Sequence, residues 1–493
     1  MTTQPPAFQF DNTYARELPG FYVEWQGAAV PDPKLVLLNS SLAGELGLDS
    51  AALAAPEMAA VFAGSASPEG ASPLAQVYAG HQFGGFSPQL GDGRALLIGE
   101  VIDQKGHRRD IQLKGSGRTP FSRGGDGKAV IGPVLREYIL GEAMHALGVP
   151  TTRALAAVTT GEMIQREGLK PGAVLTRIAS SHLRVGTFQF FAARSDTDKV
   201  RQLADYAIAR HDPDHPDADD RYLQFLARVV DRQARLVSEW MLIGFVHGVM
   251  NTDNTTISGE TIDYGPCAFL DGYDPAAVFS SIDHGGRYAF GRQPTIMQWN
   301  LARLAEALLP LFDSADLDRA VELATQELNK FPDRYRTAWL NGMCKKLGLT
   351  DLQDDDVTLF EDLLSAMEAS KADYTLVFRR LSDAVSGNTA SLFDLFEDKA
   401  DISAWVNRWD QRLSAEGRPA EEISREMNRV NPVYIPRNHK VEEGLAAAET
   451  GDYSLVEDLL DVLKDPYAER EGLEAYAKPA PQDFGPYQTF CGT

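Results

Sequence analysis

A short segment near the middle of the chain carries oxygen-bearing side chains that suit metal and proton chemistry. HGVMNTDNTTI, residues 247 to 257, holds Asp253 and Asn254, and IDYGP follows with Asp263. Mg²⁺ prefers hard oxygen ligands and usually takes one or two from the protein. Asn254 and Asp263 therefore form a candidate metal pair, which leaves Asp253 to orient or deprotonate an attacking hydroxyl. The alternative is an Asx turn between two short strands, and the adjacent His247 fits a packed structural role.

A second group of charged residues lies upstream and suits phosphate binding. Lys114 ends a predicted strand and Glu137 lies on the next predicted helix, so an ion pair between them would aim the ammonium group at phosphate oxygens. Arg177 and Arg184 lie in LTRIASSHLRVG, and bidentate guanidinium groups suit phosphate. Unrelated surface ion pairs are the alternative for these residues.

Glycine-rich segments supply further candidates for nucleotide contact. Gly91 and Gly93 would let backbone N–H groups approach a phosphate, with Arg94 beside them, although an ordinary turn explains the same glycines. Asp126 and Gly127 lie in the loop GSGRTPFSRGGDGKAVIGP. That loop either closes over a nucleotide or makes a contact between lobes.

The elements that must position these residues change in type along the chain. A strand-rich first part with one helix is predicted from two hairpins and one amphipathic stretch between them. The hairpins comprise residues 91 to 102 with 107 to 117 and residues 153 to 161 with 172 to 179, and the helix comprises 133 to 148. From about residue 195 the pattern is helical. An apolar stripe through Leu226 and Val237 predicts a helix running directly into His247, and helical patterns continue to about residue 465 before an extended tail.

This order of parts predicts an α+β, protein-kinase-like fold with two lobes. The predicted parts are a small β-rich, nucleotide-binding N-terminal lobe with an N-terminal extension, a helical C-terminal lobe that holds the catalytic and metal-binding loops, and a helical C-terminal extension with a tail. Their bounds are 1–190, 191–330 and 331–493. Single cores stop growing at roughly 250 to 300 residues, which also favours more than one lobe.

Composition excludes several classes of protein. The chain has 493 residues and a net charge of −23, from 47 Lys plus Arg against 70 Asp plus Glu, which disfavours nucleic-acid binding. Three cysteines are too few for a disulfide-stapled secreted fold. The start shows no signal-peptide pattern and no stretch is apolar enough for a membrane span, so a cytoplasmic protein without membrane or nucleic-acid partners is expected.

Several motifs together resemble one family. YAGHQFGGFSPQLGDGRA, DIQLKGSGRTPFSRGGDGKAV, LREYILGEAMHALGVPTTRAL, HGVMNTDN, DYGPCAFLDGYDP, GRYAFGRQPTIMQWNLARLAEAL and NPVYIPRNHKVEEGLAAAETGDYSLVEDLL occur in this order over most of the chain. They are similar to the selenoprotein O family, of which this chain resembles a bacterial member with cysteine in place of selenocysteine.

The resemblance implies a kinase-like fold that works as a protein adenylyltransferase, an enzyme that moves AMP from ATP to Ser, Thr or Tyr hydroxyls of acceptor proteins. It implies that the nucleotide binds in the reverse sense from protein kinases and that Mg²⁺ or Mn²⁺ is required. By position, Asp253 matches the proton acceptor, Asn254 and Asp263 match metal ligands, and Lys114 and Glu137 match the strand–helix ion pair. The nucleotide-binding positions matched are Gly91, Gly93, Arg94, Lys114, Asp126, Gly127, Arg177, Arg184 and Asp263.

One implied feature departs from the family pattern. Cys491 stands where members carry selenocysteine or cysteine, but the loop cysteine that pairs with it in some members is replaced near Phe279, which leaves Cys267 as an alternative partner and a free thiol as another outcome. Two other functions remain open at this point. They are a conventional ATP-dependent kinase and a nucleotide-binding pseudokinase scaffold without transfer activity.

Overall fold

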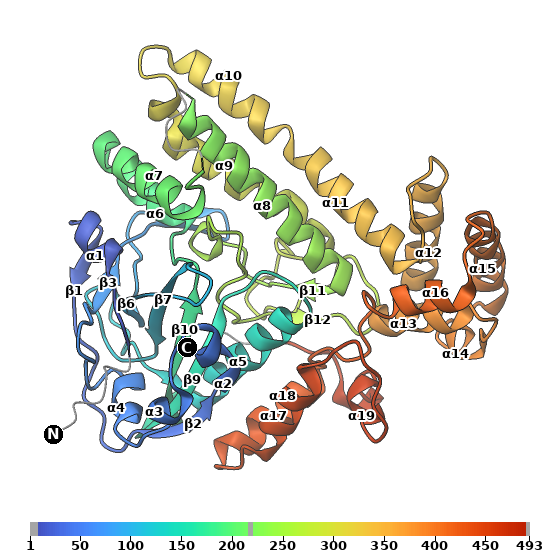
Figure 1. Ribbon diagram of the computed structural model, residues 1–493, viewed down its shortest axis with the longest axis horizontal. Coiled ribbons are helices and arrows are strands. Elements are labelled where there is room, and N and C mark those ends of the chain that lie inside the picture. Colours follow the sequence, from blue (N-terminus) through green and yellow to red (C-terminus); the bar gives the residue numbers. More distant parts are fainter. Residues whose placement is uncertain (1–7, 215–219, 490–493) are drawn as a thin grey trace.

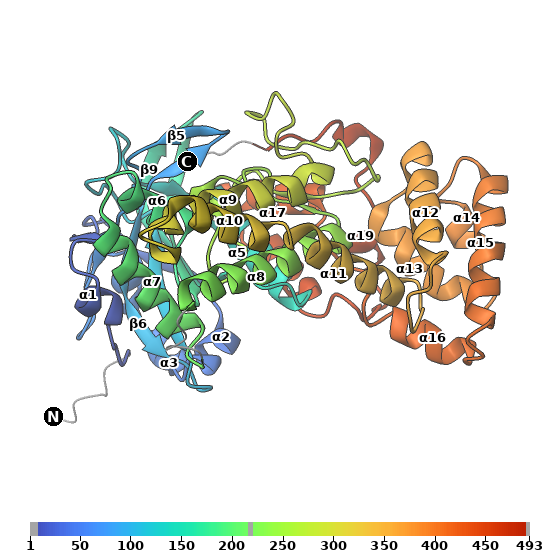
Figure 2. The same ribbon diagram turned by 90° about the horizontal axis from the view of Figure 1, so that it is seen from above.

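The computed structural model describes residues 8–214 and 220–489 as a mixed α/β protein with an antiparallel sheet and many helices (Figure 1). The sheet and its covering helices form one side of the molecule, and long helices form the other. A cluster of shorter helices extends away from both (Figure 2).

The main sheet has eight strands, in the order β1-β3-β6-β7-β10-β9-β2, with β8 paired to β10. Its strands are β1 Tyr22–Glu24, β2 Lys34–Leu38, β3 Leu74–Gln76, β6 Ala95–Ile102, β7 Arg108–Lys114, β8 Ala129–Val130, β9 Arg153–Gln165 and β10 Leu169–Ala179. Every pairing within it is antiparallel. Lys114 lies opposite Ala95 of β6 and Leu175 of β10, so the predicted first hairpin is confirmed and Lys114 ends its second strand. The second predicted hairpin is also confirmed, with strands longer than expected.

Helices cover both faces of this sheet. Successive strand residues point to opposite faces, so Val174 packs with the helices α2 (Ser40–Glu45), α3 (Ser50–Leu53) and α4 (Met58–Phe62), while Leu175 packs with α5 (Ile131–Ala146). The expectation of a single helix in this part was wrong. Together with α1 (Thr13–Glu17), the extra helices have four to six residues each, which is too short to show a helical period in sequence.

The long helices pack around one large apolar core. They are α6 Val185–Ala192, α7 Thr197–His211, α8 Arg221–Ile243, α9 Gln293–Phe312, α10 Leu317–Leu328 and α11 Phe331–Lys346. The predicted stripe of α8 is confirmed, and Leu226 and Val237 are both fully buried. However, α8 does not run into His247 as expected. It ends where Gly244 takes a left-handed φ of +74°, and β11 (Phe245–Val246), paired with β12 (Ala268–Phe269), comes between.

The C-terminal helices fall into two groups. The first group, α12 to α16, lies at the far end of the molecule in Figures 1 and 2. The second group returns to the sheet side, where Leu445 and Leu459 share an apolar core with Leu135 and Ile139 of α5. The bounds are α12 Asp356–Ser370, α13 Tyr374–Ala384, α14 Ala390–Phe393, α15 Lys399–Ser414, α16 Ala420–Met427, α17 Asn438–Glu449, α18 Ser454–Leu463 and α19 Glu474–Ala477. The helix carrying Glu137 is therefore packed between the sheet and α17 and α18.

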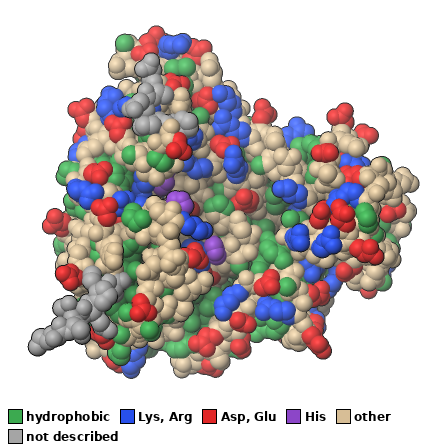
Figure 3. Space-filling view, viewed as in Figure 1, with side chains coloured by type: hydrophobic (Ala, Val, Ile, Leu, Met, Phe, Trp, Pro, Cys, Tyr) green, Lys and Arg blue, Asp and Glu red, His purple; other side chains and the backbone are tan. Residues whose placement is uncertain are grey.

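The surface is mixed in charge. On the face seen in Figure 3, acidic and basic side chains are interspersed. Within the described residues, none of the helices has the length and apolar character needed to cross a lipid bilayer.

Candidate active site

A cleft of about 1290 Å³ brings most of the predicted site residues together. Its walls come from the ends of β6 and β7, the glycine-rich loop before α5, and the segment from residue 249 to 266. Two later segments also contribute to the cleft, since Ser281 and Tyr487, near the C-terminus, line the same space. The residues that the sequence placed in a common site are thus neighbours in space, although they are far apart in the chain.

The predicted strand–helix ion pair is present. Lys114 Nζ lies 2.6 Å from Glu137 Oε2, and Glu137 is 4% exposed. Burial alone would raise the pKa of Glu137, but the charges of Arg177 and Lys114 outweigh it and lower the pKa, so the carboxylate is ionised. Lys114 is held at a fixed position at the edge of the cleft, with its ammonium group also 3.1 Å from Asp263 Oδ1.

Asp263 is the centre of a cluster of positive charge. Its Oδ1 lies 2.6 Å from Arg177 Nη2, and its Oδ2 lies 3.0 Å from Arg184 Nη1. Burial raises the pKa of this carboxyl, but the three surrounding cations outweigh burial and hold the pKa well below its usual range. Asp263 also has a φ of +62°, a left-handed conformation that costs a residue other than glycine about 1–3 kcal/mol.

Arg177 and Arg184 are engaged with carboxylates rather than open to the cleft. Arg177 is 1% exposed and also bonds Glu137 and the side chain of Gln112. Arg184 donates a hydrogen bond of 2.7 Å to the backbone oxygen of Asp253 and lies over the ring of Tyr78. Both residues are part of the cleft wall, so an entering phosphate would compete with Asp263 for their guanidinium groups.

Asp253 is a buried carboxylate with one oxygen hydrogen-bonded and the other without a partner. Gln82 Nε2 donates a hydrogen bond of 3.0 Å to its Oδ2, whereas its Oδ1 is buried without a partner among the described residues. Burial raises the pKa of Asp253 to about 6, although the hydrogen bond from Gln82 opposes this. A carboxylate with a pKa close to neutral pH is suited to act as a general base.

The loop that carries Asp253 forms a short turn close to a packed histidine. Thr252–Asn254 forms a single 3-10 turn, η1, and the two short strands proposed as the alternative are not formed; Thr256 and Thr261 make only isolated bridges. His247 is 1% exposed, and its ring nitrogen lies 2.9 Å from the Ile262 oxygen, so it has the packed role predicted for it. Burial lowers the pKa of His247, which keeps the ring neutral.

The site's oxygen atoms fit a divalent cation that is shared with phosphate. Asn254 donates its amide N–H to the Val249 oxygen at 3.0 Å, which leaves its side-chain oxygen free to face the cleft, and Asp263 is ionised. Across residues 8–214 and 220–489, no group of three His, Cys, Asp or Glu side chains is arranged to hold a metal. Mg²⁺ needs only one or two protein oxygens when phosphates supply others. Asn254 and Asp263 match that number, and Asp263 would have to give up part of its contact with the three surrounding cations.

Steric crowding explains why residues 91 and 93, near the cleft, are glycines. Gly91 has a φ of +86°, and a Cβ there would lie 2.5 Å from the Phe121 ring. A Cβ on Gly93 would lie 2.8 Å from the Phe121 oxygen. Both glycines line the cleft with Arg94, which makes no ion pair within the described part of the chain and so has a free guanidinium. Close packing of the loop on Phe121 therefore explains why glycine is needed at these positions.

The loop before α5 reaches the cleft with Asp126 and Gly127, but Asp126 already has a partner. Its two oxygens lie 2.9 and 3.0 Å from the guanidinium nitrogens of Arg166, and this hydrogen bonding lowers its pKa. Gly127 has a φ of +68°, and any side chain would collide with the backbone of Gly117. The loop is thus pinned to the β9–β10 hairpin.

Comparison with known proteins identifies the family of this chain. The family model described as "Protein adenylyltransferase SelO" matches residues 6–464. The chain belongs to the SelO family of protein adenylyltransferases. "Protein nucleotidyltransferase YdiU" from a strain of Cereibacter sphaeroides is 62% identical over 488 residues, covering 99% of this chain and 100% of that protein. Proteins with the same description from Rhizobium meliloti and Rhizobium rhizogenes are 56% and 54% identical, each over 99% of this chain and over 100% and 98% of their own lengths.

Among the described residues of this SelO-family chain, Cys267 and Cys344 are free thiols. Cys267 is fully buried, and burial raises the pKa of its thiol to about 12, which opposes formation of the reactive thiolate. Cys491 lies outside the described residues.

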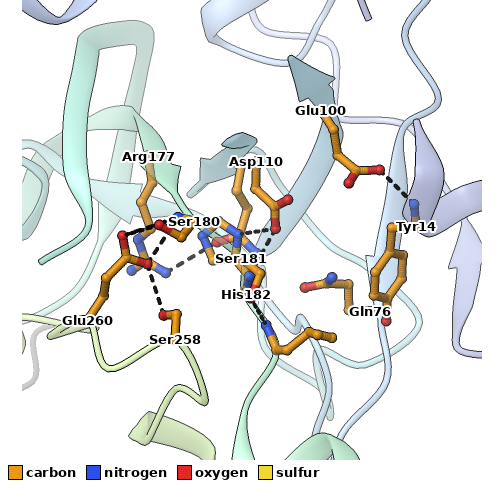
Figure 4. A network of polar contacts seen from close by, with 12 residues as sticks. Tyr14, Gln76, Glu100, Asp110, Arg177, Ser180, Ser181, His182, Ser258 and Glu260 are labelled. Carbon is orange, nitrogen blue, oxygen red and sulfur yellow. Dashed lines mark hydrogen bonds and ion pairs between the residues drawn. The ribbon is translucent and has the colours of Figure 1, made fainter. Parts of the chain in front are cut away.

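A second network of buried polar contacts lies next to the segment that carries Arg177 and Arg184 (Figure 4). Asp110 Oδ2 accepts a hydrogen bond of 2.9 Å from the backbone N–H of His182, and Asp110 Oδ1 lies 2.5 Å from Arg210 Nη2. Glu260 accepts from the backbone N–H and hydroxyl of Ser180. These bonds fix the chain between β10, which carries Arg177, and Arg184, the N-cap residue of α6.

Sequence reasoning missed two site residues, Gln82 and Asp92. Gln82 orients Asp253, and Asp92 is a cleft carboxyl whose pKa burial raises to about 6. Both lie inside the motif YAGHQFGGFSPQLGDGRA that carried the resemblance. The sequence signal for these two residues was only that each is a polar residue within a glycine-rich segment.

Proposed function

We propose that this protein transfers AMP from ATP to Ser, Thr or Tyr hydroxyls of acceptor proteins, with Mg²⁺ or Mn²⁺ and with ATP bound in the reverse sense from a kinase. Membership of the SelO family establishes the adenylyltransferase class. The finer statements rest on one observation. Asp253, with a buried oxygen that has no partner among the described residues and a pKa of about 6, lies beside a candidate metal pair at a cleft rich in cations.

We further propose that the architecture is a kinase-like pair of lobes. In this proposal residues 1–190 bind the nucleotide, residues 191–330 supply the catalytic and metal loops, and residues 331–493 form an extension. The Lys114–Glu137 pair between strand and helix supports it, as does the position of the cleft between the sheet and the long helices.

The proposed reaction is an in-line displacement at the α-phosphorus. The acceptor hydroxyl oxygen forms the new O–P bond, its proton passes to Asp253, and the bond from the α-phosphorus to the bridging oxygen breaks so that pyrophosphate leaves. A divalent cation held by Asn254 and Asp263 would neutralise phosphate charge and help to align the phosphates. Catalysis is then positioning and charge stabilisation, as in other phosphoryl and nucleotidyl transfers.

The cations of the cleft are assigned to the outer phosphates. Arg94 has a free guanidinium, and Lys114 is partly exposed at the cleft edge. Arg177 and Arg184 would exchange part of their contact with Asp263 for phosphate oxygens, because a triphosphate carries more charge than one carboxylate. Gly91, Gly93, Asp126 and Gly127 shape the walls around it. With these groups on the outer phosphates, the α-phosphorus remains for the hydroxyl.

ATP labelled at either the α- or the γ-phosphate tests this proposal. Transfer of the α-label to acceptor proteins, dependent on Mg²⁺ and lost in Asp253→Asn, is expected. Transfer of the γ-label instead would show a conventional kinase, and nucleotide binding with neither label transferred would show a scaffold.

A further inference from the structure

A strained hairpin projects beside the catalytic loop. It consists of β4 (Gly80–Gln82) and β5 (Gly85–Ser87), joined by Phe83 and Gly84, whose φ values are +51° and +87°. A two-residue turn with both φ positive favours Asn, Asp or Gly, and a bulky residue there is strained by about 1–2 kcal/mol. Phe83 is nevertheless 37% exposed, so burial of its ring does not account for the strain.

The hairpin is tied to the proposed base. The backbone N–H of His81 donates to Thr252 Oγ1 at 2.7 Å, and that of Phe83 donates to Asn251 Oδ1 at 3.1 Å. Gln82 bonds Asp253 directly. A partner that binds the hairpin is therefore placed against the catalytic loop.

The two faces of the hairpin differ. Gly80 and Gln82 face Asp253, and a Cβ on Gly80 would lie 2.9 Å from Asp253 Cγ. The alternate residues face the other way, where the His81 ring lies 4.8 Å from that of Phe86 and 5.2 Å from that of Trp299. An extended segment beside β5 would have alternate side chains on these two faces.

The outer edge of β5 is open. His81 pairs with Phe86, and the N–H of His81 points away from β5 toward Thr252, so this is a pair without mutual hydrogen bonds. The N–H and C=O of Phe86 consequently face the outer edge, where no strand of the described chain pairs with β5 except β4. In Figure 2, β5 lies at the upper edge of the molecule. An unpaired edge of this kind is a template for an added strand.

The face with Phe86 combines apolar and positive character. Phe86 is 43% exposed, and the guanidinium of Arg287 lies 4.8 Å from the Trp299 ring centre. Arg287 has no carboxylate within ion-pair distance in the described residues, and its Nε is buried without a partner. In a chain with 70 acidic and 47 basic residues, an unpaired arginine here favours a partner that brings a carboxylate.

We propose that β5 is the docking edge for the acceptor protein, which adds an extended segment to it. The hydroxyl-bearing side chain lies on the face of Gln82 and Asp253. The residues on either side of it lie on the face of Phe86 and Arg287, so apolar and acidic residues are preferred there and not at positions two residues away. This inference rests on the proposed adenylyl transfer.

The test uses α-labelled ATP and position-scanning peptide libraries centred on Ser, Thr or Tyr, with the full-length chain. The variants are Phe86→Ala, Arg287→Glu and the matched control Leu317→Ala, which changes another exposed apolar residue, 62% exposed, at the start of α10.

Wild type is expected to prefer acidic or apolar residues adjacent to the hydroxyl residue. Arg287→Glu should reduce labelling of acidic peptides about fivefold, as for a surface ion pair, and favour lysine. Phe86→Ala should raise KM for peptide and leave the ATP Kd unchanged.

Backbone pairing has its own readout. N-methylation of alternate peptide residues should abolish labelling in one register and leave the other unaffected. The proposal is overturned if intact proteins are labelled but no peptide is, if preferences are the same in wild type and Arg287→Glu, or if Phe86→Ala alters the oligomeric mass, which would identify a second copy as the occupant. Absence of any α-label transfer by wild type would instead remove the proposed function, and the docking edge with it.

Discussion

The ionised form of Asp253 is needed for the proposed catalysis, whereas its burial makes that ionised form unfavourable for stability. Replacing Asp253 with Asn separates the two effects. The carboxyl is 7% exposed, and burial raises its pKa from an ordinary value of 3.8 to about 6. Between these values the folded protein holds a proton that the unfolded chain releases. The free energy of unfolding therefore falls as pH rises through this window, by about 3 kcal/mol in total.

Asn does not titrate, so Asp253→Asn should escape this loss. Between pH 5 and pH 8, the free energy of unfolding of the variant should rise by about 1.4 kcal/mol relative to that of wild type. This is less than the total of about 3 kcal/mol because part of the pH window lies below pH 5. Any fixed effect of the substitution on packing cancels in this difference. The variant should be inactive at both pH values, and wild-type transfer should fall as pH decreases below about 6.

Urea unfolding followed by tryptophan fluorescence at pH 5 and pH 8 measures the difference. Asp354→Asn is the matched control, since it removes one exposed carboxylate on the loop before α12. The reasoning would be refuted if the gap between Asp253→Asn and wild type were the same at both pH values, or if it closed as pH rose.

Three further substitutions test the site. Asp263→Ala should abolish metal-dependent AMP transfer, and unchanged activity would contradict its role. Glu137→Ala leaves the buried guanidinium of Arg177 without one of its carboxylates, so the free energy of unfolding should fall by about 3–5 kcal/mol and the Tm should be lower. A Tm equal to that of wild type would show that this ion pair does not contribute to stability. Gly91→Ala places a Cβ at a φ of +86° against Phe121 and should weaken ATP binding measured by calorimetry, whereas wild-type affinity would show that the loop adapts.

Local patterns predicted the elements of the site well. Alternating and helical periods placed Lys114 at the end of its strand and Glu137 on the following helix, and the structure brings them to 2.6 Å. The short helices α1 to α4 escaped detection because four to six residues do not complete a period.

Long-range partners were not predictable from one sequence. Arg177 and Arg184 were expected to face phosphate, but in the structure both bond Asp263, 86 and 79 residues away in the chain. Nothing local to an arginine specifies which of 70 carboxylates will fold beside it. The return of α17 and α18 to α5 was missed for the same reason, since an apolar helix face does not name its partner.

The most direct test of the central claim is a crystal structure with a non-hydrolysable ATP analogue and Mg²⁺. The account predicts the α-phosphorus next to Asp253, the cation on Asn254 and Asp263, and the outer phosphates on the arginines. A terminal phosphate directed at Asp253, with adenine buried as in a conventional kinase, would contradict it.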